Sequence, residues 1–347
     1  MKIAIHERKG SFSDRWIPYC ESHGIPFMQV DCYDSDIVSR LAGCDGLMWH
    51  WNHEDYREQN FARQLIFSLE KMGKKVFPNF DSCWHFDDKV GQKYLLEAVG
   101  ADLVPTTVLY GRTEALAWIG KAEFPKVFKL RAGAGSANVK LVRDSREARK
   151  LVKQAFGRGF PPVDWRSGLR QRFWILKRDR NAKALVHLAK GVARIALPRK
   201  DLALLPVQKG YIYFQDFIPG NSYDDRVVVI GERAIAIRRN NREGDFRASG
   251  SGLIEYGREL FDPKVISLAF EVAKKIGTQS LAFDFLYDAG GHPKITEISY
   301  CYTQGIAYDT CPGYWDRELN WHEAQVNPQQ FIMEDFIRYI EKACLNG

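Results

Sequence analysis

The first 80 residues alternate between short apolar stretches typical of β-strands and longer stretches typical of amphipathic helices. The strand-like stretches are "KIAIHE", "IPFMQVD", "DGLMWHW" and "KVFPN". The longest helix-like stretch is "EDYREQNFARQLIFSLEKMGKK", in which Phe61, Leu65, Leu69 and Met72 share one face and Gly73 ends the helix. Because successive parallel strands need a crossover connection, this alternation predicts a parallel sheet covered by helices.

Ligands of such sheets bind beyond the carboxyl ends of the strands. The third strand runs into "WHWNH", so we expect Trp49, His50, Trp51 and His53 near a site. No Cys, Asp or Glu nearby completes a metal set with the two histidines, which favours ordinary polar loop residues. The G-x-G-x-x-G fingerprint is missing after the first strand, which disfavours a dinucleotide-binding domain.

Composition and charge indicate which partners and which compartment to expect. The 347 residues carry a formal net charge of +7, and Lys and Arg are densest between Arg143 and Arg199. That segment is predicted to be mostly helical, and its sequence indicates no chemistry. The seven cysteines form no CxxC pair, and no stretch approaches the roughly 18 apolar residues of a membrane span. We therefore expect a cytoplasmic protein with reduced thiols and with neither nucleic acid nor a membrane as partner.

A glycine-rich loop lies in "FPKVFKLRAGAGSANVKLV". No lysine follows its glycines as a Walker A loop requires, and "NVKLV" alternates like a strand, so the loop joins two strands. Glycines let backbone N–H groups approach phosphate oxygens, and Lys129 on the entering strand could reach a phosphate. An ordinary β-hairpin with an exposed lysine remains the alternative.

A second hairpin is predicted in "LAFDFLYDAGGHPKITEIS". Folding it symmetrically about Gly290 and Gly291 places Asp284 opposite Glu297, with Ile295 and Glu297 on one face. Directly opposed Cβ atoms lie about 4.5–5.5 Å apart, and two carboxylates that close repel unless a cation lies between them. Mg²⁺ with nucleotide phosphates suits such ligands, whereas solvated acids on an outer face are the alternative.

The third element is an arginine-rich segment, "AIRRNNREGDFRASGSG". Arg238, Arg239, Arg242 and Arg247 precede a loop of small residues. Arginines beside a metal–phosphate site can hold a transferring phosphoryl group. An exposed basic loop is the alternative for this segment alone.

In their order along the chain, these elements resemble the ATP-grasp superfamily of carboxylate–amine ligases, most closely its ribosomal-protein glutamate ligase type. The resemblance covers roughly residues 88–305. It implies an α/β fold, α+β in the C-terminal part, in which an ATP-grasp fold follows a Rossmann-like parallel α/β domain. The implied domains are an N-terminal α/β domain at 1–85, a lid subdomain with a helical insertion at 86–210, and a metal-carrying subdomain at 211–347.

The resemblance also implies roles for individual residues and the cofactors ATP and Mg²⁺, or Mn²⁺ in its place. It implies that Arg247 and Arg239 stabilise the transferred phosphoryl group, and that Asp284, Glu297 and Ser299 bind the metal. Nucleotide binding is implied for Lys89, Lys129, Gly133, Gly135, Ser136, Gln215, Asp216, Phe217, Ile218 and Asp224.

The implied activity is ADP-forming ligation of a small-molecule carboxylate to an amine through an acyl phosphate. An amino acid, a peptide or an amino-sugar compound fits as substrate, and a homodimer is compatible with the sequence. The "WHWNH" loop with Tyr300, Tyr302 and Arg317 is expected on the substrate side. Ser299 and Ser249 stand where the superfamily usually has Asn. The alternatives are therefore an ATP-binding protein with decayed ligase activity and a kinase-like phosphoryl transfer.

Overall fold

The N-terminal part forms the predicted parallel sheet. The computed structural model describes residues 1–53, 55–133, 138–161, 165–196, 204–248, 250–303 and 305–345. The strand order is β2–β1–β3–β4, all parallel. The strands are β1 (Ile3–His6), β2 (Phe27–Val30), β3 (Gly46–Met48) and β4 (Lys75–Phe77), and the connecting helices are α1 (Ser13–Ser22), α2 (Ile37–Arg40) and α3 (Tyr56–Lys71). Helix α2 is a single turn.

A smaller antiparallel sheet carries the glycine loop. Its order is β5–β8–β6–β7, so the two strands that flank the loop pair as the expected hairpin. Its elements are β5 (Thr106–Leu109), α6 (Arg112–Ile119), β6 (Lys126–Lys129), β7 (Lys140–Val142), α7 (Ser145–Ala155) and β8 (Ile212–Asp216). Between α7 and β8 lie two further helices that pack on each other, α8 (Trp165–Asp179) and α9 (Ala182–Ala196). The prediction of a mostly helical basic segment is confirmed.

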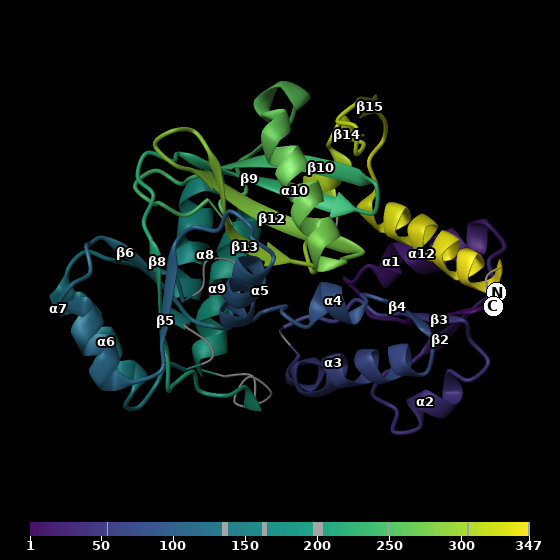
Figure 1. Cartoon of the computed structure of the whole chain (residues 1–347), viewed down its shortest axis with the longest axis horizontal. Helices are drawn as coiled ribbons and strands as arrows, with labels where there is room; N and C mark the ends of the chain where they lie inside the picture. Colours follow the sequence, from purple (N-terminus) through teal and green to yellow (C-terminus); the bar gives the residue numbers. More distant parts are fainter. Residues whose placement is uncertain are drawn as a thin grey trace.

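The largest sheet has seven strands in the order β13–β12–β9–β10–β14–β15, with β11 also paired to β10. Its strands are β9 (Tyr223–Ile230), β10 (Arg233–Asn240), β11 (Ile254–Glu255), β12 (Ser280–Tyr287), β13 (Pro293–Ser299), β14 (Gly313–Trp315) and β15 (Trp321–Glu323). The remaining helices are α4 (Phe80–Cys83), α5 (Lys89–Ala98), α10 (Pro263–Ile276), α11 (Ile306–Asp309) and α12 (Pro328–Leu345). Figure 1 shows α10 lying across this sheet and α12 running from it to the N-terminal sheet.

Helix α10 begins at a capping aspartate and ends at a glycine. The Asp262 side chain accepts from the Lys264 N–H, and Pro263 occupies the first turn. Gly277 ends the helix at φ 77°, a left-handed conformation that favours glycine. The buried residues of α10, between Val265 and Ile276, join the core that the large sheet forms on this side, and the helix contacts β9, β10 and β12.

The two faces of the large sheet pack against different helices. Val227, Phe283 and Ile298 share one face, where they join the α10 side chains in one hydrophobic core. On the other face, Val228 and Ala282 pack in a second core together with residues of α1 and α12. Period-two alternation therefore directs Asp284, two residues beyond Ala282, to the face that α10 does not cover.

In the acidic hairpin the two acids are paired as predicted, but the pairing between them and the turn is irregular. Asp284 pairs with Glu297, as expected. Nearer the turn, Phe285 pairs with Ile295, so Thr296 is an extra residue that forms a β-bulge. The bulge corrects the predicted faces, because Ile295 lies in the core with Phe283 instead of sharing a face with Glu297. The turn is centred on Gly290, and the bulge restores the pairing of the two acids.

Helix α12 joins the large sheet to the N-terminal sheet. The Phe336 ring approaches Gly46 on β3 so closely that an added Cβ there would lie 2.7 Å from it. Helix α12 therefore packs directly against the N-terminal sheet. No helix in the described ranges combines the length and the apolar character that crossing a membrane requires.

Candidate active site

A cavity of about 770 Å³ opens over the charged face of the large sheet. Lys129, Arg247, Asp284 and Glu297, which come from four distant segments, all line it. So do Lys89 and the remaining predicted residues that the structure describes: Gly133, Gln215, Asp216, Phe217, Ile218, Asp224, Arg239 and Ser299. Gly135 and Ser136 lie outside the described residues.

The sheet register pairs acids with arginines at the cavity floor. Asp284 lies opposite Arg226, and Asp224 lies opposite Arg239. The Arg226 guanidinium donates to both Asp284 carboxylate oxygens at 2.6 and 2.8 Å, and Arg239 donates likewise to Asp224 at the same distances. Arg239 Nη2 also lies 2.9 Å from Asp284 Oδ2, which joins the two pairs into one network.

This network shifts the pKa values of its two carboxyls in opposite directions. Burial raises the pKa of Asp284, but the Arg226 and Arg239 guanidiniums outweigh it and hold that pKa well below its ordinary value. For Asp224, burial and the neighbouring Asp284 outweigh the attraction of Arg239, so its pKa is raised. Asp284 therefore stays ionised, as a metal-binding carboxylate must.

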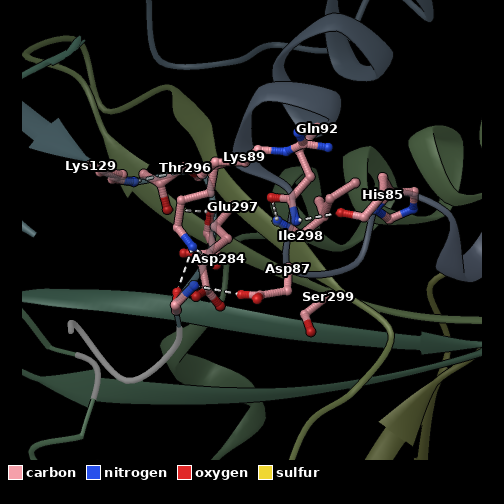
Figure 2. Close-up of polar contacts among 12 residues, drawn as sticks. His85, Asp87, Lys89, Gln92, Lys129, Asp284, Thr296, Glu297, Ile298 and Ser299 are labelled. Atoms are coloured by element: carbon pink, nitrogen blue, oxygen red, sulfur yellow. Dashed lines mark hydrogen bonds and ion pairs between the residues drawn. The ribbon is translucent and has the colours of Figure 1, made fainter. Parts of the chain in front are cut away.

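Lys89 bridges the acidic hairpin and the glycine loop (Figure 2). Its Nζ lies 3.0 Å from Glu297 Oε1 and donates to the Gly133 carbonyl at 2.7 Å. Burial disfavours the Lys89 charge, but the Glu297 and Asp87 carboxylates outweigh burial and raise its pKa. A lysine that stays charged at the first turn of α5 is suited to an anionic ligand.

The start of the glycine loop is fastened to the N-terminus of α5. The Lys89 N–H donates to the Arg131 carbonyl at 2.9 Å, and the Gly133 N–H donates to Asp87 Oδ1 at 2.6 Å. Arg131 Nη2 donates to Asp88 Oδ2 at 2.5 Å. The sequence analysis did not identify Asp87 or Asp88 as loop partners. Two consecutive acids before the first helical lysine were the available signal.

Lys129 is the last residue of β6. Its side chain is buried, and its ammonium makes a long polar contact. Its Nζ lies 3.4 Å from the Thr296 carbonyl, on the bulge of β13. Burial lowers the pKa of Lys129 to about 8, although Glu297 opposes this shift. An anion bound beside this ammonium would therefore favour its protonated form.

We expect ATP affinity to weaken as the pH rises through about 8, because the triphosphate binds the protonated Lys129 better than the neutral amine. Lys129→Arg should remove this pH dependence, since a guanidinium stays charged over the whole range. ATP titrations from pH 6.5 to 9.5 test both statements. An identical pH profile in the two proteins would assign the titration to another group.

Four of the predicted nucleotide-binding residues, at positions 215–218, line the cavity at the end of β8. The Gln215 side chain is buried and donates to Thr106 Oγ1 at 3.2 Å. Asp216 instead pairs with Lys126, whose Nζ lies 2.6 Å from its carboxylate. Phe217 and Ile218 supply apolar surface against which a flat ring can pack.

Arg247 is held by an acid two residues before it. Its Nε and Nη2 donate to the Asp245 carboxylate at 2.9 and 2.8 Å. Of the other arginines in its segment, Arg238 binds Asp225 on the opposite face of the sheet, away from the cavity. The Arg242 guanidinium lies over the ring of Trp174, on helix α8.

The N-terminal sheet contributes the opposite wall of the cavity. His50 and His53 line it as expected, together with Arg8 and Asn52, which were not predicted. The expectation for Trp49 and Trp51 was wrong. Both indoles are fully buried in the hydrophobic core, because alternate residues of the strand exit point inward.

His50 is a neutral side chain in this wall. Burial, reinforced by Arg8, lowers its pKa to about 3. The Phe12 N–H donates to His50 Nδ1 at 3.2 Å, so the proton is on Nε2, which lies 3.1 Å from Cys301 Sγ. Arg8 in turn donates to the His50 carbonyl at 2.8 Å.

The expected substrate-side residues separate into two groups. Tyr302 lines the cavity. Tyr300 is fully buried and donates its hydroxyl to the Trp51 carbonyl, so it supports the wall from behind. The expectation for Arg317 was wrong, because it pairs with Glu232 and does not line the cavity.

The donor set is compatible with Mg²⁺ bound together with phosphates. Asp284 on β12 is paired directly with Glu297 on the neighbouring strand β13, and both residues line the cavity. The described residues hold no cluster of three or more His, Cys, Asp or Glu that would bind a metal alone. Mg²⁺ commonly uses one or two carboxylates and takes its other ligands from phosphates and water. The Ser299 hydroxyl donates to the Cys301 carbonyl at 2.7 Å, which leaves its oxygen able to accept or coordinate.

Comparison with known proteins identifies the fold. The sequence matches no protein-family model and none of the curated proteins compared with it. Among solved structures, D-alanine–D-alanine ligase from Bacillus anthracis complexed with ATP superposes with a TM-score of 0.57 at 14% identity, over 99% of both chains. The chain has the ATP-grasp fold.

Two further structures match this ATP-grasp chain. A RimK domain ATP-grasp protein from Sphaerobacter thermophilus covers 87% of this chain and 91% of its own, with a TM-score of 0.52 and 15% identity. The biotin carboxylase domain of 2-oxoglutarate carboxylase from Hydrogenobacter thermophilus, in complex with MgADP, ADP and bicarbonate, has a TM-score of 0.57 and 15% identity. It covers 97% of this chain and 69% of its own.

Proposed function

We propose that this protein is an ATP-dependent ligase that activates a carboxylate as an acyl phosphate and joins it to an amine. The observation that carries the proposal is the meeting of Lys129, Arg247, Asp284 and Glu297 in one cavity. The local structure of each segment would not by itself bring these four residues together. The ATP and MgADP bound to the neighbouring structures support ATP and Mg²⁺, or Mn²⁺, as the cofactors.

The charges of the cavity explain how it receives a triphosphate. Asp284 is bound by Arg226 and Arg239, and Glu297 by Lys89, so acids and bases now satisfy each other. A divalent cation on the two acids would take over their neutralisation. The guanidiniums and the ammonium could then turn to phosphate oxygens, which bind such donors strongly.

In the proposed reaction, a carboxylate oxygen of the substrate attacks the γ-phosphorus of ATP, and the bond from that phosphorus to the β–γ bridging oxygen breaks. The released ADP leaves an acyl phosphate. The amine nitrogen then attacks the acyl carbon, the carbon–oxygen bond to phosphate breaks, and the amine loses a proton. The metal would supply charge neutralisation at the phosphates.

The protein's own part is to position the reactants and to balance charge. Lys89 and Lys129 would neutralise the nucleotide phosphates. Arg247, held by Asp245, would stabilise the transferring phosphoryl group, with Arg239 beside it. Asp224, Gln215 and the backbone near Phe217 and Ile218 would orient the nucleoside. The glycine loop containing Gly133, Gly135 and Ser136 would cover the phosphates.

The substrate carboxylate and amine would occupy the wall formed by the N-terminal sheet. Arg8, Asn52 and His53 lie there together with the neutral His50. This mixture of a cation and polar side chains suits a small polar molecule such as an amino acid, an amino-sugar compound or the end of a peptide.

A screen of ADP release tests the proposal. Pools of carboxylates and amines are added to the protein with ATP and Mg²⁺, and active pools are resolved into single compounds. We expect ADP release to require both a carboxylate and an amine. Hydroxylamine in place of the amine should trap the acyl phosphate as a hydroxamate.

The same screen separates the two alternatives. A stable phosphorylated product formed without any amine would identify a kinase-like transfer. ATP binding without ADP release in every pool would identify a nucleotide-binding protein, the reading that Ser299 and Ser249 motivate.

A further inference from the structure

The helical hairpin α8–α9 holds the positive charge of the whole chain. Residues 165–196 include nine lysines and arginines and one aspartate, a net charge of +8. The rest of the chain has 41 basic and 42 acidic residues and is therefore close to neutral. A charge so concentrated on 32 residues, which comprise two helices and their connection, indicates an anionic partner for this hairpin.

The hairpin is held together along one side of α9. Gly191 is buried there, and a Cβ at this position would lie 2.5 Å from Arg172 Cδ on α8. The Arg172 Nη1 donates to the His187 carbonyl at 2.8 Å. Helix α9 therefore uses its Gly191 side for packing and leaves its other side to solvent.

That exposed side of α9 is apolar. The exposed fractions of Leu185, Val186 and Val192 are 57%, 52% and 55%. They belong to a stripe with spacings i, i+3, i+4, i+7, i+10 and i+11, which places all its members on one helix face. The stripe consists of Ala182, Leu185, Val186, Ala189, Val192 and Ala193, all exposed.

A basic edge borders the apolar stripe. Lys183, His187 and Lys190 follow one another at i, i+4 and i+7, and all three are exposed. On α8, the Phe173 ring is 62% exposed. An apolar stripe edged by lysines is the arrangement of a helix that lies in a membrane interface, with its apolar side in the acyl region and its amines at the headgroups.

We propose that the α8–α9 hairpin binds the surface of an anionic lipid bilayer. Charge complementarity selects this partner, since anionic headgroups attract a segment whose sequence carries a net charge of +8. The apolar stripe and its basic edge both lie along a single helix, which is the arrangement of a helix that lies flat in a fluid interface. Nucleic acid would need unbroken basic contacts, which the apolar stripe interrupts.

Each helix has 15 residues and thus a length of about 22 Å, shorter than a hydrocarbon core of roughly 30 Å. The hairpin would lie on the bilayer and not cross it. The sequence-based expectation of no membrane partner considered only spanning segments, and this proposal replaces it for the membrane surface. The Arg242–Trp174 contact links the hairpin to the arginine segment of the active site.

Vesicle flotation of the full chain tests the proposal without reference to ligase activity. Vesicles of phosphatidylcholine with one quarter phosphatidylglycerol are compared with pure phosphatidylcholine, each at low and high salt. We expect binding to the anionic vesicles only, and its loss at high salt. No binding to the anionic vesicles, or equal binding to both kinds, would overturn the proposal.

Three double variants locate the binding surface. Each lysine near an anionic surface contributes roughly a five-fold factor to partitioning, so Lys183→Gln with Lys190→Gln should weaken it by about tenfold or more. Leu185→Gln with Val186→Gln should weaken it similarly, because it removes apolar contact. Lys150→Gln with Lys153→Gln, which alters two exposed lysines on α7, is the charge-matched control.

Unchanged thermal unfolding of all three variants shows that the substitutions act at the surface. If the two hairpin variants partition like the parent, the binding surface lies elsewhere and the proposal fails. If an acidic helical peptide binds the hairpin while the vesicles do not, the surface recognises a polypeptide and the proposal fails as well.

Discussion

Asp284→Asn is expected to abolish turnover, lowering the rate by about 10³-fold or more, and to remove the Mg²⁺ dependence of ATP binding. An amide cannot carry the charge that holds a divalent cation, and it leaves Arg226 and Arg239 without their shared counter-ion. Titration of ATP with and without Mg²⁺ checks the binding, and ADP release checks the turnover.

The same substitution should lower stability by roughly 3–5 kcal/mol, because it removes one partner from a buried ion network. Asp225→Asn provides the matched control. Asp225 is also a buried acid, bound by Arg238, but it lies on the other face of β9. We expect the control to lose comparable stability and to keep ATP binding and turnover. If both variants lose Mg²⁺-dependent binding alike, the effect is structural and Asp284 has no particular role.

Arg247→Ala is expected to slow acyl-phosphate formation by about 10²–10³-fold while leaving ATP affinity nearly unchanged. The reason is that the guanidinium would act on charge that develops during transfer more than on bound ATP. Single-turnover formation of ADP, or of the hydroxamate with hydroxylamine, measures this step. Equal single-turnover rates for variant and parent would remove Arg247 from the mechanism.

Asp245→Asn separates positioning from chemistry. Asp245 holds the Arg247 guanidinium through two hydrogen bonds, so its amide should weaken the hold without removing the cation. We expect a loss of about tenfold, smaller than that of Arg247→Ala. A loss as large as that of Arg247→Ala would indicate that Asp245 itself contacts the reacting groups.

The parts of the site that lie in local patterns could be predicted from the sequence. The strand-flanked glycine loop and the Asp284–Glu297 pair each depend on residues close in the chain. The pairing of the two acids was correct although a bulge at Thr296 lay between them and the turn. The face of Ile295 was wrong for the same reason, because one extra residue reverses the alternation beyond it.

The parts that depend on distant strand pairing could not be predicted in the same way. Arg226 binds Asp284 because β9 and β12 are neighbours with those two residues in register. Its sequence signal was weak: it is a polar residue two places after Asp224, on the same face of an alternating strand. Arg8 reaches the cavity only because the N-terminal sheet packs beside the large one.

The side-chain directions of the aromatic residues after β3 could not be predicted from their position in the chain alone. The strand exit was expected to present Trp49, His50 and Trp51 together. The backbone alternates there, so the histidine faces the cavity and both tryptophans fill the core. Large apolar side chains gain more from burial than a polar site gains from them.

A crystal structure with a non-hydrolysable ATP analogue and Mg²⁺ would show whether the cavity residues converge on one triphosphate. We predict one nucleotide in the cavity, with Lys89 and Lys129 on its phosphates, Arg247 beside the γ-phosphate, and the cation on Asp284 and Glu297. A nucleotide bound elsewhere, or a triphosphate in the cavity that Lys129, Arg247 and the two acids do not approach, would contradict it.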